Sequence, residues 1–325
     1  MAENISVDIT RVSDGEPTPA EPAPRSRNTC PECGSHYRED EMVANLRVCA
    51  RCGHHFPVTA RERIVQLTDE GSWSEIARNL RSSDPLGFVD SKPYPERVEA
   101  AEQATGLRDA VLVGEASIGG QRVVLAVMDF TFLGGSMGSV VGEKFLRATD
   151  LAVAERVPMV SVAASGGARM QEGVLALMQM AKTVAAVDTL REARQPYISV
   201  LAHPTTGGVA ASFAALGDVI IAEPGALLSF SGPRVVKQTT REDVPDDFGL
   251  AESNYRHGHI DMIVPRPELR DQLARAIALL SGGSPYRIPS LAGEIDPVGA
   301  VGRALADARR RIGGIFRAGD NGIPS

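Results

Sequence analysis

The chain has no surplus of positive charge, no long apolar run and few aromatic residues. Its net charge of -7 argues against nucleic acid or an anionic membrane as a general partner. No apolar run could span a bilayer, and the N-terminus lacks the apolar core of a signal peptide, so we expect a cytoplasmic protein. Aromatics make up only 5% of the residues whereas glycine numbers 32, which favours an α/β fold with helices packed closely on a sheet.

Cysteine is absent outside one short block, which holds Cys30, Cys33, Cys49 and Cys52. Each C-x-x-C knuckle aims two thiolates at one point, and two knuckles complete a tetrahedral zinc site. Such a site has no open position for water, so we expect a structural zinc ribbon. Ribbons often bind nucleic acid, but arginines and carboxylates are equal in number between residues 30 and 63, so this one forms no basic patch.

Changes of composition divide the chain into five predicted segments. The first is rich in proline, glutamate, serine and threonine without apolar periodicity, which predicts disorder. A polar stretch punctuated by prolines follows the ribbon, and glycine and proline increase again after residue 281. The segments are a disordered tail (1–28), the zinc ribbon (29–57), a wrapping segment (58–106), the main domain (107–281) and a C-terminal extension without an assigned role (282–325).

The main domain repeats a unit of strand, Gly-Gly turn and helix. The turns are Gly134-Gly135, Gly166-Gly167 and Gly207-Gly208, and their irregular spacing favours a superhelix of ββα units over a fixed-period solenoid. The carboxyl ends of parallel strands lie along one edge of a sheet, so we expect the turns to line one cleft. Glycine pairs bring bare backbone N–H groups against a ligand, and no nucleotide P-loop ending is present, so an enolate or other oxyanion is the expected ligand.

The helix after the second turn is expected over residues 170–194. It carries apolar residues at helical spacing, with Val174, Leu177, Met178 and Ala181 on one face. Since an amphipathic helix normally turns its apolar stripe toward the core, we expect these side chains to form the inner face of the helix.

Side chains suited to acid–base chemistry are scarce near the turns. His203 is a candidate base, although a loop histidine bonded to backbone explains it as well. Glu172 could act as an acid or base, or could simply stabilise a helix start. Arg169 could bind phosphate or carboxylate, or form an ordinary surface ion pair. An oxyanion-holding backbone without an evident catalyst favours enolate chemistry whose base comes from a cofactor or a partner.

Short motifs recur across the main domain. They are DF (129–130) with MGSVVG (137–142), ASGGARMQE (164–172), YISVL (197–201), PTTGGVAAS (204–212), IAEP (221–224), GPRV (232–235) and IDMIV (260–264). Together with the ribbon they resemble the carboxyltransferase β subunit of bacterial acetyl-CoA carboxylase, from Cys30 to about Leu280. The resemblance implies a crotonase-like fold. It also implies transfer of carboxylate from carboxybiotin to acetyl-CoA, giving malonyl-CoA for fatty acid synthesis, with biotin itself as the base.

The resemblance also implies site residues and partners. By the family pattern, Gly207 and Gly208 supply backbone N–H groups to an oxyanion. The residues implied to line the acyl-CoA site are Gly134, Gly135, Ser136, Gly166, Gly167, Ala168 and Arg169. A second oxyanion hole belongs to a homologous α subunit, which implies an α2β2 assembly. Carboxybiotin arrives on a biotin carboxyl carrier protein, which is charged by biotin carboxylase.

Three alternatives remain at the level of sequence. Lys237, which follows the GPRV motif, also fits carboxylases of larger acyl-CoA substrates such as propionyl-CoA. A crotonase-like hydratase or isomerase would act alone on an enoyl-CoA, but the carboxylate pair that it needs is absent. A zinc-ribbon protein that binds nucleic acid is opposed by the balanced charge of the ribbon.

Overall fold

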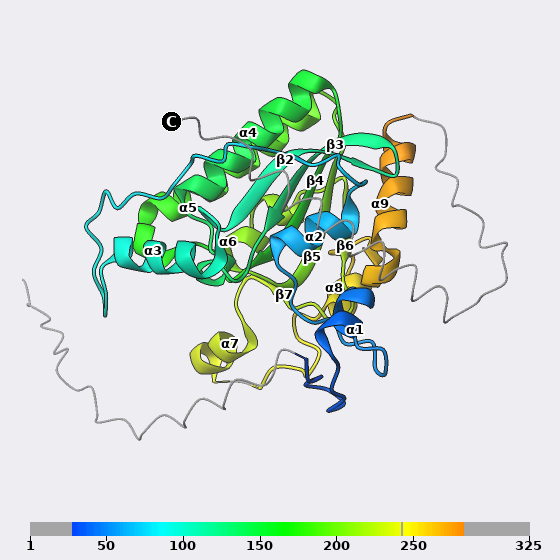
Figure 1. Cartoon of the computed structure of the whole chain (residues 1–325). Helices are drawn as coiled ribbons and strands as arrows, with labels where there is room; N and C mark the ends of the chain where they lie inside the picture. Colours follow the sequence, from blue (N-terminus) through cyan, green and yellow to red (C-terminus); the bar gives the residue numbers. More distant parts are fainter. Residues whose placement is uncertain (1–27, 242, 283–325) are drawn as a thin grey trace, which may run out of the picture.

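A mixed eight-stranded sheet forms the centre of the molecule (Figure 1). The structure is a computed structural model that describes residues 28–241 and 243–282. The strand order is β1-β2-β3-β4-β5-β6-β8, and β7 pairs with β5. The strands are β1 (Ser74–Ile76), β2 (Val111–Ile118), β3 (Gln121–Met128), β4 (Met159–Ser165), β5 (Tyr197–Thr206), β6 (Val219–Ala222), β7 (Leu228–Ser229) and β8 (Met262–Ile263). The predicted α/β class is confirmed.

Helices cover the sheet on both sides. Figure 1 shows α4 and α5 side by side on one side and α9 on the other. The helices are α1 (Glu39–Ala44), α2 (Ala60–Leu67), α3 (Tyr94–Thr105), α4 (Ser139–Glu155), α5 (Val174–Glu192), α6 (Gly207–Ala210), α7 (Pro233–Thr240), α8 (Ala251–Arg256) and α9 (Arg266–Leu280). Across the described part of the chain, none of them combines the length and the apolar character that crossing a bilayer requires.

The sheet changes from antiparallel to parallel at β3. Strands β1, β2 and β3 are antiparallel neighbours, whereas β4 pairs with β3 and β5 in parallel. All residues of β4 are buried, as expected for an apolar strand covered on both faces. Because β4 and β5 run in parallel, with Val160 opposite Ile198, the loops after both strands emerge at the same edge. This edge carries the glycine turns.

The predicted inner face of α5 is wrong. Val174 is 62% exposed and Leu177 is 57% exposed, and the opposite face with Gln179 and Thr183 is buried instead. The reason is close packing on α4, where a Cβ atom at Gly142 would overlap the side chain of Gln179. Periodicity therefore did not identify which face of the helix is buried against α4.

The ribbon has a small apolar cluster of its own. Cys30, Met42, Cys49 and Phe56 form it, separate from the large cluster around the sheet. The division into a ribbon (29–57), a wrapping segment (58–106) and a main domain (107–281) stays a prediction. The predicted tail and C-terminal extension lie outside the described residues, except for residues 28 and 282.

Candidate active site

Backbone contact brings the glycine turns together. Gly167 (φ +115°) and Gly207 (φ +57°) lie in the left-handed region that favours glycine. A Cβ atom on either residue would lie 3.1 Å from the Cα atom of the other, so a side chain at either position would push the two turns apart by a few tenths of an ångström. The first turn joins the second because the Gly166 N–H donates to Gly134 O at 2.9 Å. The three turns therefore lie together at the carboxyl edge of the sheet.

The hydrogen bonds of these turns distinguish their N–H groups. The Gly167 N–H donates to Ser165 Oγ at 3.0 Å. The Gly207 N–H, which the resemblance assigned to an oxyanion, donates instead to Phe230 O at 3.0 Å. The Gly208 N–H has no acceptor among the residues that the structure describes. Gly208 is thus the member of the predicted pair that can donate to a ligand without first losing a bond.

The side chain of Arg169 is fully buried, so its ion pairs lie inside the molecule and not on the surface. Its guanidinium donates two hydrogen bonds to the carboxylate of Asp109, of 2.9 and 2.7 Å. It also donates to the hydroxyls of Ser82 and Tyr94 and to both oxygens of Ser136. Burial alone would lower the pKa of Arg169, but the facing carboxylate outweighs it and raises that pKa. Through its bonds to Ser136, the guanidinium anchors the chain next to the Gly134-Gly135 turn from inside the molecule.

The two acid–base candidates are already engaged. Glu172 is buried and accepts from the Tyr94 hydroxyl at 2.8 Å. Its other oxygen accepts from the N–H and hydroxyl of Ser139, at 2.6 Å each, and so caps the start of α4. The Nδ1 atom of His203 accepts from the Leu227 N–H at 3.2 Å, which is the backbone-bonded alternative. Partial desolvation lowers the pKa of His203, which favours the neutral ring.

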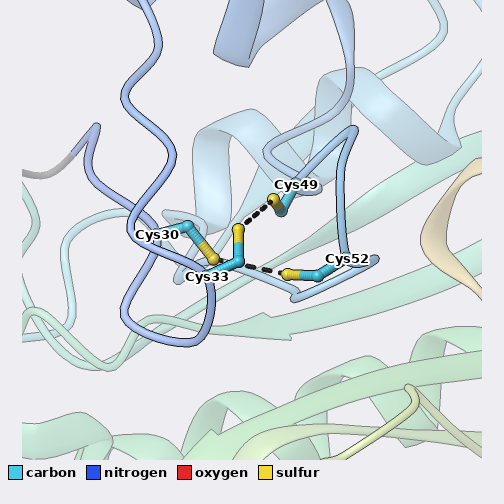
Figure 2. Close-up of side chains that lie close together, drawn as sticks. All are labelled: Cys30, Cys33, Cys49 and Cys52. Carbon is cyan, nitrogen blue, oxygen red and sulfur yellow. Dashed lines mark hydrogen bonds between the residues drawn. The ribbon is translucent and has the colours of Figure 1, made fainter.

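The four cysteines converge on one point, as their spacing predicted (Figure 2). Their Sγ atoms all lie within 4.8 Å of one another. The Sγ atoms of Cys30 and Cys52 are 3.5 Å apart, and those of Cys33 and Cys49 are 3.6 Å apart. A tetrahedral zinc ion with Zn–S bonds of about 2.3 Å requires sulfur atoms roughly 3.8 Å apart. Four thiols at this spacing therefore fit a closed metal site.

A second buried charge cluster, which the sequence analysis missed, joins the ribbon to the sheet. Glu223 Oε1 accepts from Arg63 (2.6 Å) and Arg266 (2.8 Å), and its Oε2 accepts from Arg266 (2.8 Å). Burial would raise the pKa of Glu223, but the two arginines hold it well below its usual range. Arg266 Nη1 also donates to three ribbon carbonyls. They are Leu46 O, Arg47 O and Phe56 O.

Comparisons with known proteins point to one family. The carboxyl transferase domain family matches residues 57–281. The acetyl-coenzyme A carboxylase carboxyl transferase subunit beta of Thermus thermophilus is 52% identical over 257 residues, which are 79% of this chain and 90% of the relative. The protein of the same name from Acaryochloris marina is 54% identical over 77% of this chain and 82% of the relative.

Solved structures show the same fold. A transcarboxylase 12S chain with methylmalonyl-coenzyme A bound is 29% identical over 67% of this chain, with a TM-score of 0.57. This chain spans 42% of that longer one. A malonate decarboxylase hetero-dimer from Pseudomonas contains a chain that is 25% identical over 79% of this chain and 95% of that chain, with a TM-score of 0.53. The chain therefore belongs to the carboxyl transferase family, within the group formed by the β subunits of acetyl-coenzyme A carboxylase.

Proposed function

We propose that this chain transfers the carboxylate of carboxybiotin to acetyl-CoA, giving malonyl-CoA for fatty acid synthesis. The relatives at about half identity carry the name of that enzyme's subunit. The structural observation that supports it is the free N–H of Gly208 where the glycine turns meet. The alternative of a larger acyl-CoA substrate is less favoured, because the transcarboxylase with methylmalonyl-coenzyme A bound is 29% identical to this chain.

The residues of this chain would stabilise charge and leave the proton transfer to another group. Removal of a proton from the acetyl methyl places negative charge on the thioester oxygen, and the Gly208 N–H would donate to that oxygen. One such donor is worth roughly 3 kcal/mol in other enzymes. The backbone of Gly134, Gly135, Gly166 and Ala168 would line the acyl group. Carboxybiotin on its carrier protein would supply both the carboxyl group and the base.

The chain should produce malonyl-CoA when it is combined with its α subunit, carboxybiotin and acetyl-CoA. Propionyl-CoA tests the larger substrate and crotonyl-CoA tests the hydratase alternative in the same assay. Consumption of crotonyl-CoA by the chain alone, or no turnover with any acyl-CoA in the complete mixture, would rule out the proposal.

The four cysteines would hold zinc. Four thiolates at tetrahedral spacing favour zinc or an iron–sulfur centre, and zinc needs no redox partner. With every ligand position filled by protein, the ion would stabilise the ribbon and take no part in the reaction. Elemental analysis should find about one zinc ion per chain, lost in Cys33→Ser together with a lower Tm. A stable wild-type chain without zinc would contradict this assignment.

An apolar face of α5 supports a second subunit as partner. Val174, Leu177, Met178, Ala181 and Val184 form this face, and all of them are exposed. Contiguous exposed apolar side chains usually mark a protein interface. We therefore assign this face to the homologous α subunit, in an α2β2 assembly that also receives the carrier protein. This assembly would work in the cytoplasm.

Leu177→Glu should abolish co-purification with the α subunit, because it places a charge in the centre of the apolar face of α5. Thr189→Glu is the matched control, since it adds the same charge to the exposed polar end of the same helix. Size-exclusion chromatography of the co-expressed subunits checks both, and thermal melts show whether each variant is folded. Equal association of the two variants would show that the partner docks elsewhere.

A further inference from the structure

A small pocket lies between the end of the ribbon and the carboxyl edge of the sheet. Its volume is about 30 Å³, room for about two water molecules or one small ion. Residues 55–58, where the ribbon joins the wrapping segment, form one wall, and residues of β3, β4 and β5 form the other. Ala164 and His203 line it, and they lie two and four residues before the glycine pairs of the second and third turns. The pocket therefore lies at the base of both turns.

The charged residues around the pocket leave a surplus of positive charge. Arg63, Glu223 and Arg266 line it and are nearly fully buried, two cations with one anion. Arg266 uses all three of its side-chain nitrogens on Glu223 and the ribbon carbonyls. Arg63 donates once, to Glu223, and its other N–H groups have no acceptor within the described chain. Arg63 is therefore the cation that Glu223 does not fully neutralise, and it also carries the N–H groups that have no acceptor.

Two histidines add donors. The Nε2 atom of His55 accepts a hydrogen bond from the backbone N–H of Arg266 at 3.1 Å. Burial lowers the pKa of His55 to about 4, so the ring is neutral at pH 7 and its hydrogen is on Nδ1. That Nδ1 atom is buried and has no hydrogen-bond partner. His203 accepts through Nδ1 and therefore carries its hydrogen on Nε2.

Donors without acceptors in a positively charged pocket favour an anionic oxygen ligand over water, and the buried Nδ1–H of His55 is costly to leave unpaired. We propose that the pocket binds a small planar carboxylate anion, with Arg63 and the Nδ1–H of His55 as donors to its oxygens. Free bicarbonate and the terminal carboxylate of malonyl-CoA both have this chemistry. The second source rests on the proposed function, whereas the first does not.

Bicarbonate titrated into the full-length chain labelled with ¹⁵N-histidine should shift the His55 Nδ1–H signal saturably, at constant ionic strength set by sodium chloride. Arg63→Lys keeps the charge next to Glu223 but loses the planar fork, and should weaken binding about ten- to hundred-fold. His203→Gln should weaken it less, because the side chain of His203 is exposed. His257→Gln is the control, since His257 is exposed, bonds to Ser253 O and does not line the pocket.

Malonyl-CoA and acetyl-CoA, which differ by the carboxylate, separate the two sources. A shift with malonyl-CoA but not acetyl-CoA assigns the pocket to the acyl carboxylate, and a shift with bicarbonate alone assigns it to the free anion. No shift with either, or equal binding by the wild type, Arg63→Lys and His203→Gln, would mean that the pocket holds only water and would overturn the proposal. The bicarbonate titration needs no turnover, so it remains readable if carboxyl transfer fails.

Discussion

Gly207→Ala should reduce the kcat of carboxyl transfer by about 10²-fold or more. The new Cβ atom would lie 3.1 Å from Gly167 Cα and 3.3 Å from Gly166 O, both of which are backbone atoms that cannot rotate away. The turns would have to separate, which moves the neighbouring Gly208 N–H from its position. Loss or displacement of one oxyanion donor costs about 10²-fold in kcat. Steady-state kinetics of the assembled enzyme measure the effect.

Gly225→Ala is a matched control for this substitution. Gly225 also has positive φ (+67°), but a Cβ atom there would meet nothing within 4 Å. Both variants carry the backbone strain of about 1 kcal/mol, so their difference isolates the contact between the turns. Gly225→Ala should keep full activity. Equal kcat values for the two variants would show that this contact does not position the donor.

Arg169→Met should lower the free energy of unfolding by about 3–5 kcal/mol, because it leaves Asp109 and Glu172 buried without their cation. The pair of Arg169 and Asp109 is completely shielded from solvent, and the guanidinium also satisfies Ser82, Tyr94 and Ser136. Such a loss is a large part of the stability of an ordinary domain. Urea unfolding followed by circular dichroism measures it, and methionine keeps much of the volume of the side chain.

An exposed arginine provides the comparison for this prediction. Arg147 pairs with Glu143 at 2.9 Å on the surface of α4, where both side chains reach solvent. Arg147→Met should therefore change the free energy of unfolding by about 0.5 kcal/mol or less. Adding Asp109→Leu to Arg169→Met should restore part of the loss, since it removes the unpaired charge. If Arg169→Met and Arg147→Met had equal free energies of unfolding, the buried ion pair would contribute no more to stability than the exposed one.

Features defined by local pattern could be predicted from the sequence. The cysteine spacing predicted that the four thiols converge on one point, because each knuckle needs only four consecutive residues to place two thiols. The repeated order of strand, Gly-Gly pair and helix predicted the repeated units, because this order is typical of parallel strands joined by helices. The carboxyl-edge position of the turns followed from that order.

Features defined by distant partners could not be predicted. Arg169 was found by its motif, but its role depends on Asp109 and Ser82, which are 60 and 87 residues away. The sequence does not show that the Gly207 N–H is hydrogen-bonded whereas the Gly208 N–H is free, because the acceptor of the Gly207 N–H is Phe230 O, which is distant in the sequence. Likewise, the outward face of α5 depends on how closely it approaches α4, which periodicity does not encode.

The hydrogen bonds from Arg266 to the ribbon carbonyls couple the stability of the start of α9 to the closure of the ribbon. If the ribbon opened, Arg266 Nη1 would lose three acceptors inside the molecule, so the start of α9 is most stable when the ribbon is closed. By mass action, an ion that binds only the closed ribbon adds stability in proportion to the logarithm of its free concentration. The supply in the cell of an ion that the four cysteines can bind would thus influence how much folded subunit survives.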